Sequence, residues 1–118
     1  MNRPALVGQA ILVVEDEPLV ALEIAQCLRA AGAAVVVAHC LREALLLADR
    51  PDLSAAVLDF GLRDGDTGAL CERLNARDIP FVLYTGYLHV DEACSKGVRL
   101  SKPASAEELL SAVGGLVH

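Results

Sequence analysis

A cluster of acidic residues near the N-terminus is the part of this sequence best suited to chemistry. Glu15, Asp16 and Glu17 follow directly on the apolar run of residues 10–14, and Pro18 closes the cluster. A short, largely β-branched apolar run that ends at such a break predicts a buried strand, so the acids are expected at the rim of a sheet. Crowded carboxylates repel one another unless they share a cation. The cluster therefore predicts a magnesium site.

Three further polar residues occupy the same kind of position later in the chain. Asp59, Thr85 and Lys102 each come directly after a short stretch with the composition of a strand. The crevice outside the carboxyl ends of parallel strands is where open α/β sheets bind ligands, so these side chains are expected to converge with the acidic cluster. A nucleophilic carboxylate, a divalent ion, a hydroxyl and a fixed ammonium are the parts that phosphoryl transfer to a carboxylate requires.

Five predicted strands, alternating with helical stretches, position these residues. The strands are expected at 10–14, 34–38, 54–58, 81–84 and 98–101, and the helices at 18–31, 41–49, 67–76 and 105–113. Asp66 or Thr67 can cap the third helix, and Ser105 with Glu108 forms a capping box for the last. Residues 88–95 have only a weak pattern. The alternation predicts an α/β fold, a doubly wound (flavodoxin-like) five-stranded parallel sheet with strand order 2-1-3-4-5 and helices on both faces.

Composition limits the class of protein. The chain has 118 residues, enough for one domain, with 54% hydrophobic and 3% aromatic residues. A net charge of −6 argues against nucleic-acid binding, and no apolar run has the length of a membrane span. The four cysteines form no Cys-x-x-Cys pair and are expected to be reduced, as in a cytoplasmic protein; they are Cys27, Cys40, Cys71 and Cys94.

As a set, these motifs resemble the signature of the receiver domain of two-component response regulators. The residues that carry the resemblance are Glu15-Asp16, Asp59, Thr85 and Lys102-Pro103. The resemblance extends over residues 9–115, with residues 1–8 as a short N-terminal extension. It implies a phosphoacceptor protein that catalyses only its own phosphorylation and autodephosphorylation and is not a conventional enzyme.

The resemblance also implies a role for each site residue. Asp59 accepts a phosphoryl group from a histidine kinase or histidine phosphotransfer protein, Thr85 binds a phosphoryl oxygen, and Lys102 pairs with the phosphoryl group. The implied ligands of Mg²⁺ are Glu15, Asp16, Asp59 and the backbone carbonyl of Gly61. The bond between Lys102 and Pro103 is expected to be cis, as only X-Pro bonds readily are. Output is expected through contact with an unknown downstream protein.

Residues 83–87 resemble the Phe-Ala-Thr-Gly-Tyr motif of a group of alphaproteobacterial single-domain receivers, with Leu83 and Tyr84 in place of Phe and Ala. Many receivers carry an aromatic switch residue three positions before the lysine, but this chain has Arg99 there. The switch is therefore expected in Thr85, Gly86 and Tyr87, within a mobile segment 86–95.

The first predicted helix offers a surface for the kinase. Val20, Ile24 and Leu28 form its core stripe, and Leu19 and Leu22 fall outside that stripe. We expect at least one of the two outlying leucines to be partly exposed and to contact the kinase, as this helix does in receivers generally. His39, His89 and His118 are interpreted as surface or structural residues.

Other interpretations stay open at this point. The acids could simply favour a helix N-terminus, and Asp59, Thr85 and Lys102 could be ordinary turn residues. The chain could be a receiver excised from a hybrid histidine kinase or larger regulator, or a phosphate-independent interaction module. A small phosphatase of another doubly wound family would need a second aspartate two residues after Asp59, where this chain has Gly61.

Overall fold

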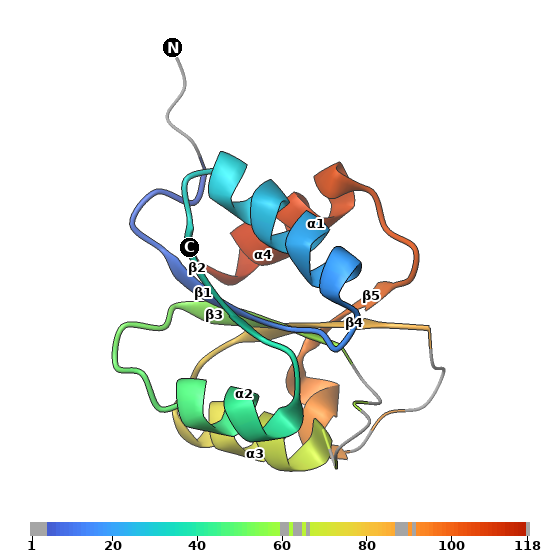
Figure 1. Cartoon of the computed structure of the whole chain (residues 1–118). Helices are drawn as coiled ribbons and strands as arrows, with labels where there is room; N and C mark the ends of the chain where they lie inside the picture. The colour runs from blue at the N-terminus through green and yellow to red at the C-terminus, as the bar shows by residue number, and fades with distance from the viewer. Residues whose placement is uncertain are drawn as a thin grey trace.

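The computed structural model describes residues 5–59, 62, 65, 67–86, 90 and 92–117, which form a parallel sheet between two layers of helices (Figure 1). The strands are β1 (Ala10–Val14), β2 (Ala34–Ala38), β3 (Ala55–Asp59), β4 (Phe81–Thr85) and β5 (Val98–Ser101). The helices are α1 (Pro18–Ala30), α2 (Leu41–Leu47), α3 (Thr67–Ala76), the 3-10 helix η1 (Glu92–Lys96) and α4 (Ala106–Leu116). All pairings are parallel in the order β2-β1-β3-β4-β5, which confirms the predicted fold class and strand order.

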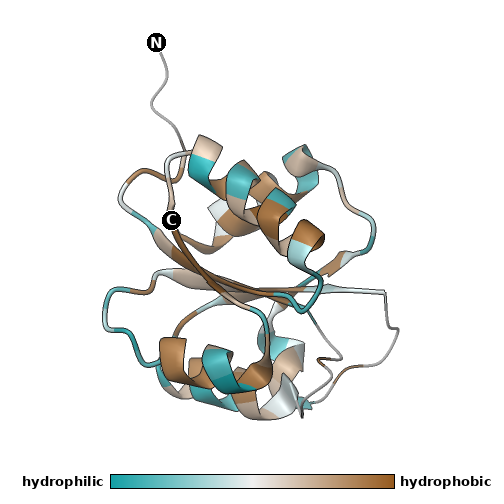
Figure 2. Ribbon diagram, in the orientation of Figure 1, coloured by the Kyte–Doolittle hydropathy of each residue, from teal (hydrophilic) through white to brown (hydrophobic). Residues whose placement is uncertain are grey.

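The sheet separates two hydrophobic cores. Helices α1 and α4 cover one face, and α2, α3 and η1 cover the other (Figure 1). Successive strand residues point to opposite faces, so Leu12 and Leu58 enter one core while Val13 and Val57 enter the other. The strands form an apolar layer between helices that carry both polar and apolar residues (Figure 2). Because β3 is buried along its whole length, it reads in the sequence as a continuous apolar run rather than an alternating one.

The helix signals in the sequence act as expected at both ends of the chain. Pro18 occupies the first turn of α1, where a missing N–H costs nothing, and Gly32 turns the chain after it with φ 101°. The Ser105 side chain accepts a hydrogen bond from the Glu108 N–H at 3.1 Å, and the Glu108 carboxylate accepts one from the Ser105 N–H at 3.0 Å. This capping box fixes the start of α4.

The boundaries differ from the predictions in small ways. Strands β3 and β4 include Asp59 and Thr85 as their last residues, because each is still paired with the neighbouring strand. The predicted helix at 41–49 ends as a regular helix at Leu47. The weakly patterned segment contains the short helix η1. Asp66, one of the two candidate caps of α3, lies outside the described residues.

The prediction that all four cysteines are reduced is wrong for two of them. Cys71 of α3 and Cys94 of η1 form a disulfide with an S–S distance of 2.12 Å. They are 23 residues apart, and the fold brings them together by packing η1 on α3. No local sequence motif predicts this tertiary contact. Cys27 and Cys40 are free thiols.

The segment before β1 packs against the rest of the fold. Leu6 is fully buried, and its N–H donates to the Ala31 carbonyl at 2.8 Å, which holds the segment before β1 against the end of α1. None of the helices formed by the described residues has the length and apolar character needed to cross a membrane.

Candidate functional site

The carboxyl edge of the sheet gathers the predicted site residues. Glu15 and Asp16 follow the end of β1, Asp59 ends β3, Thr85 ends β4, and Lys102 follows β5. Parallel pairing in register brings these ends together: Asp59 pairs with Tyr84, and Thr85 pairs with Ser101, the residue before the lysine. The convergence therefore follows from the strand order and from the position of each residue at a strand end.

Three carboxylates form one cluster at this edge. Glu15, Asp16 and Asp59 each offer an oxygen atom, and these atoms all lie within 4.8 Å of one another. Only 1% of Glu15 and 8% of Asp59 is exposed. The Glu15 carboxylate accepts a hydrogen bond from the Glu17 N–H at 3.1 Å, which orients it toward the cluster. Burial and mutual repulsion make such a cluster costly unless a cation offsets its charge.

Lys102 supplies one such cation from the protein itself. Its Nζ lies 2.8 Å from Asp59 Oδ1 and 3.5 Å from Glu15 Oε2. Its backbone N–H donates to the Thr85 carbonyl at 3.1 Å, which extends the pairing of β5 with β4 by one bond. The peptide bond between Lys102 and Pro103 is cis. One ammonium contacts two of the three carboxylates, so the cluster keeps a net negative charge.

Electrostatics at the site follow from this arrangement. Burial raises the pKa of Glu15 above its usual range; the Glu17 N–H opposes that shift and the charge of Asp59 adds to it. Burial by itself would lower the pKa of Lys102, but the hydrogen bond and charge of Asp59, with the charge of Glu15, outweigh it and raise this pKa. Lys102 is therefore charged at neutral pH.

The donor set fits a hard divalent cation. Carboxylate oxygens are the ligands that Mg²⁺ prefers, and Mg²⁺ sites in proteins usually use one or two carboxylates together with waters. The cluster offers oxygen ligands only and has more negative charge than Lys102 can offset. Gly61, the remaining implied ligand, lies outside the described residues.

The other candidate residues are placed as follows. Thr85 is buried at the end of β4 and Gly86 is exposed directly after it, whereas Tyr87 lies outside the described residues. Arg99 is exposed on β5. His39 is exposed after β2, and its backbone N–H donates to Glu43; His89 and His118 lie outside the described residues.

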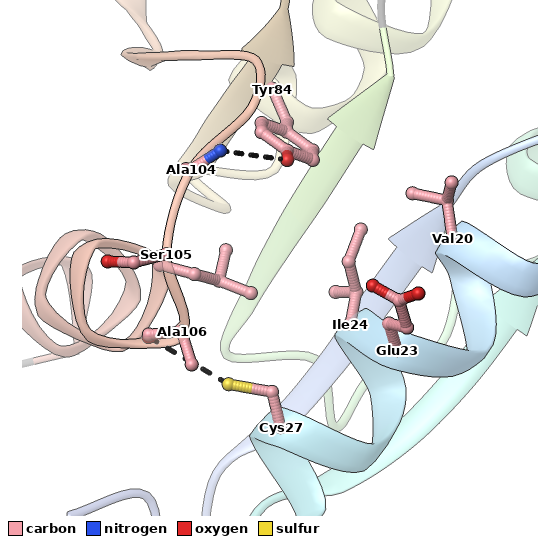
Figure 3. A pocket seen from close by; sticks show the side chains of 9 residues that line it. Val20, Glu23, Ile24, Cys27, Tyr84, Ala104, Ser105 and Ala106 are labelled. Atoms are coloured by element: carbon pink, nitrogen blue, oxygen red, sulfur yellow. Dashed lines mark hydrogen bonds between the residues drawn. The ribbon is translucent and has the colours of Figure 1, made fainter.

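Tyr84 stands out in the sequence only as a departure from a motif, yet it contacts the site. Its hydroxyl accepts a hydrogen bond from the Ala104 N–H at 3.2 Å, and Lys102 Nζ lies 5.2 Å from the centroid of its ring. The only signal in the sequence was a large aromatic residue where the motif has Ala. Tyr84 also lines a cavity of about 110 Å³ between α1 and the segment that leads into α4 (Figure 3). The other lining residues are Val20, Glu23, Ile24, Cys27, Ala104, Ser105, Ala106 and Leu109.

Comparison with known families identifies the family of this chain. Residues 11–114 match the family described as the response regulator receiver domain. The chain belongs to this family. It is thus a receiver domain of the kind used in two-component signalling, with an acidic cluster and a lysine at the carboxyl edge of its sheet.

The sequence identity to individual curated relatives is low. The receiver domain is 28% identical over 113 residues to the acid tolerance regulatory protein ActR of Rhizobium meliloti (strain 1021). The match covers 89% of this chain and 58% of ActR, so the chain spans little more than half the length of this relative.

Solved structures that share its fold include two receiver proteins with a metal ion. One is the receiver domain of the sensor histidine kinase PA1611 from Pseudomonas aeruginosa PAO1, with a magnesium ion in the active site cleft, at 27% identity and a TM-score of 0.76. That match covers 92% of this chain and 99% of the other. A response regulator from Burkholderia pseudomallei with a phosphorylated aspartic acid, a calcium ion and citrate is 29% identical with a TM-score of 0.77, over 88% of this chain and 65% of that one.

Proposed function

We propose that this receiver domain accepts a phosphoryl group on Asp59 from a histidine kinase or histidine phosphotransfer protein and signals by contact with a downstream protein. One observation carries the proposal: the Asp59 carboxylate lies 2.8 Å from Lys102 Nζ inside a cluster of three carboxylates. The phosphorylated aspartic acid of the related Burkholderia pseudomallei protein supports this assignment.

The transfer uses groups that the chain already holds in place. An oxygen of Asp59 attacks the phosphorus of a phosphohistidine, the new O–P bond forms as the P–N bond breaks, and the electron pair returns to the imidazole nitrogen. Lys102 keeps its charge next to the incoming phosphoryl oxygens, and the Thr85 hydroxyl donates to one of them. Mg²⁺, held by Glu15, Asp16, Asp59 and the Gly61 carbonyl, would offset the negative charge that collects on the phosphoryl oxygens.

Labelling with a small phosphodonor tests this function. Incubation with acetyl phosphate and Mg²⁺ should add the mass of one phosphoryl group, and Asp59→Asn should add none. Asp52→Asn is the matched control, because Asp52 is an exposed carboxylate paired with Arg50 outside the cluster. If Asp59→Asn gains the same mass as the unaltered protein, Asp59 is not the acceptor.

Signal output is proposed to run through the segment after β4, with Thr85, Gly86 and Tyr87 as the switch. The position of the usual aromatic switch is occupied by the exposed Arg99. A Thr85 hydroxyl drawn toward the phosphoryl group would move the start of this segment. With a beryllofluoride mimic, the amide resonances of Gly86 and η1 should shift, and Thr85→Ala should remove the shift. Unchanged resonances in both proteins would contradict this route.

The subfamily and context are also proposals. Thr85-Gly86-Tyr87 supports membership of the Phe-Ala-Thr-Gly-Tyr group of alphaproteobacterial receivers. We place the domain at residues 9–115, with 1–8 as an extension, in the cytoplasm, where its kinase partner would present the donor histidine. Phosphotransfer from a panel of purified alphaproteobacterial histidine kinases would identify the pathway, and failure with every member of the panel would count against the subfamily.

A second candidate role is that of a receiver within a hybrid histidine kinase. It is favoured by the likeness to receiver domains of the sensor kinase PA1611 and the hybrid histidine kinase CckA, each covered over 99% of its length. The full coding sequence of the gene decides between the roles. The gene of a hybrid kinase would also encode a transmitter domain in the same polypeptide.

A further inference from the structure

Tyr84 links Lys102 to the connection between β5 and α4. It is the last but one residue of β4, and its ring packs on the same face of the sheet as Val82, in the core beneath α1 and α4. From there the hydroxyl reaches the Ala104 N–H at 3.2 Å, and the ring centroid lies 5.2 Å from Lys102 Nζ. One side chain thus contacts both the ammonium of the site and the backbone two residues beyond it. Figure 3 shows the second of these contacts, between the Tyr84 hydroxyl and Ala104.

These contacts lie in the segment after β5, where backbone pairing with β4 ends. The last backbone bond between β4 and β5 runs from the Lys102 N–H to the Thr85 carbonyl, and the capping box at Ser105 begins α4. Between them, the Ala104 N–H is held by the Tyr84 hydroxyl. Tyr84 therefore fixes the path by which the chain leaves the site.

The lysine needs such a support. Its side chain is 33% exposed and has four rotatable bonds. Two ion pairs at the ammonium therefore attract the charge but leave the conformation of the side chain loosely fixed. The aromatic face of Tyr84 attracts the ammonium electrostatically and adds a third contact from another side. This contact is made with the ring and does not use the charge of Asp59.

Packing alone does not account for the residue. The Tyr84 side chain borders a cavity of about 110 Å³ and is half-buried, whereas its neighbours Leu83 and Val82 are fully enclosed. A side chain selected only to fill the core would leave less space beside it.

We propose that Tyr84 is a positioning residue for phosphoryl transfer, which holds the Lys102 ammonium beside the Asp59 carboxylate through its ring and ties that position to Ala104 through its hydroxyl. This inference rests on the proposed function of Asp59 and Lys102. It assigns to this chain an aromatic support at a position where the motif it resembles has Ala.

Two substitutions separate the contacts. Tyr84→Phe keeps the ring and removes the hydroxyl, so the Lys102 contact should persist while the Ala104 amide exchanges faster with solvent. Tyr84→Leu removes the ring, and labelling of Asp59 by acetyl phosphate at saturating Mg²⁺ should slow roughly fivefold, the scale of one contact between an ammonium and an aromatic face. Val82→Ala, which loosens the same core without contacting Lys102, should leave the rate near that of the unaltered protein.

The lysine itself provides a readout that packing would not change. The sequence holds two lysines, Lys96 and Lys102, so lysine-selective isotope labelling gives two sets of signals with Lys96 as an internal reference. The ε-methylene protons of Lys102 should be shifted by the Tyr84 ring current in the unaltered protein and in Tyr84→Phe. The shift should vanish in Tyr84→Leu, and Tyr84→Phe keeps this measurement possible if the leucine variant folds poorly.

A double-mutant cycle completes the test. In a Lys102→Ala background, followed over long incubations, Tyr84→Leu should slow labelling no further, because the ring acts through the lysine. An equal slowing in both backgrounds, or an unshifted Lys102 signal in the unaltered protein, would overturn the role of Tyr84 alone. An unaltered protein that takes no label although the Lys102 shift is present would instead overturn the proposed function, and with it any role of this contact in catalysis.

Discussion

Glu15 is a site residue whose buried position disfavours its charged form. It is almost fully buried, and its pKa is raised by burial even with Lys102 and the Glu17 N–H acting in the opposite direction. A carboxyl whose pKa is higher in the folded state than in the unfolded state favours folding most when it is protonated. That contribution is complete below the unfolded value, near 4.5, and is lost as the pH rises through the folded pKa.

Glu15→Gln should therefore stabilise the metal-free protein at neutral pH. The amide keeps an oxygen for the Glu17 N–H and removes the buried charge. Urea unfolding with a chelator present should show a higher free energy of unfolding for the variant at pH 7, and the gap should narrow toward pH 4. Glu17→Gln, an exposed acid two residues away, is the control. A lower stability of Glu15→Gln at pH 7 would show that the pairing with Lys102 dominates.

Metal binding should depend more on Asp16 than on Glu15. Both Glu15 oxygens are already engaged, one by the Glu17 N–H and the other by Lys102. Asp16→Ala should weaken Mg²⁺ binding by roughly tenfold or more, and Glu15→Ala by less. Calorimetric titration suits this protein, which has no tryptophan for a fluorescence signal. Equal affinity of Asp16→Ala and the unaltered protein would remove Asp16 from the metal site.

At the scale of elements, α1 presents apolar side chains to solvent beside the site. Ile24 and Leu28 are buried as predicted, whereas Leu19 is 74% exposed and Leu22 is 48% exposed. The prediction that at least one of these two leucines is partly exposed is confirmed. Because α1 begins directly after the acidic cluster, a kinase that brings its histidine to Asp59 would cover this helix.

Leu22→Ser should slow transfer from a cognate kinase by roughly tenfold, the cost of removing one moderate anchor from an interface. Labelling by acetyl phosphate should be unchanged, since the small donor needs no docking surface. Leu46→Ser is a matched control: Leu46 is 72% exposed on α2, which lies on the opposite face of the sheet (Figure 1). Loss of both reactions in Leu22→Ser would indicate a folding role, and equal slowing in Leu46→Ser would indicate a general surface effect.

The five strands and the four α-helices were predictable because they carry local signals, whereas the short helix η1 carries only a weak pattern. Buried parallel strands appear as β-branched apolar runs, and Pro18, Gly32 and the capping box mark helix ends. The convergence of the site residues followed from the strand order. The contact of Tyr84 with Lys102 could not be predicted, because it depends on the path of the chain after β5. Burial of Leu6, a single apolar residue without periodic neighbours, depends equally on tertiary packing.

At the scale of the whole molecule, one covalent bond crosses between distant parts of the chain. The disulfide of Cys71 and Cys94 joins α3 to η1, so the intervening residues, including all of β4, form a closed loop. Both side chains are buried in the core between the sheet and helices α2, α3 and η1. Asn75 Nδ2 also donates to the Ala93 carbonyl at 2.7 Å, so η1 retains a polar contact with α3 in addition to the disulfide.

Cross-linking residues 23 positions apart should stabilise the fold by about 3 kcal/mol, because the closed loop restricts the unfolded chain. Urea unfolding with a reductant should show this loss, and Cys71→Ala should show it without reductant. Cys40→Ala is the control, since Cys40 is a free thiol and its variant should respond to reductant as the unaltered protein does. Alkylation after unfolding without reductant should modify Cys27 and Cys40 only. If it modifies all four cysteines, the protein exists as the dithiol, and α3 and η1 are held together by noncovalent contacts such as packing and the Asn75 hydrogen bond.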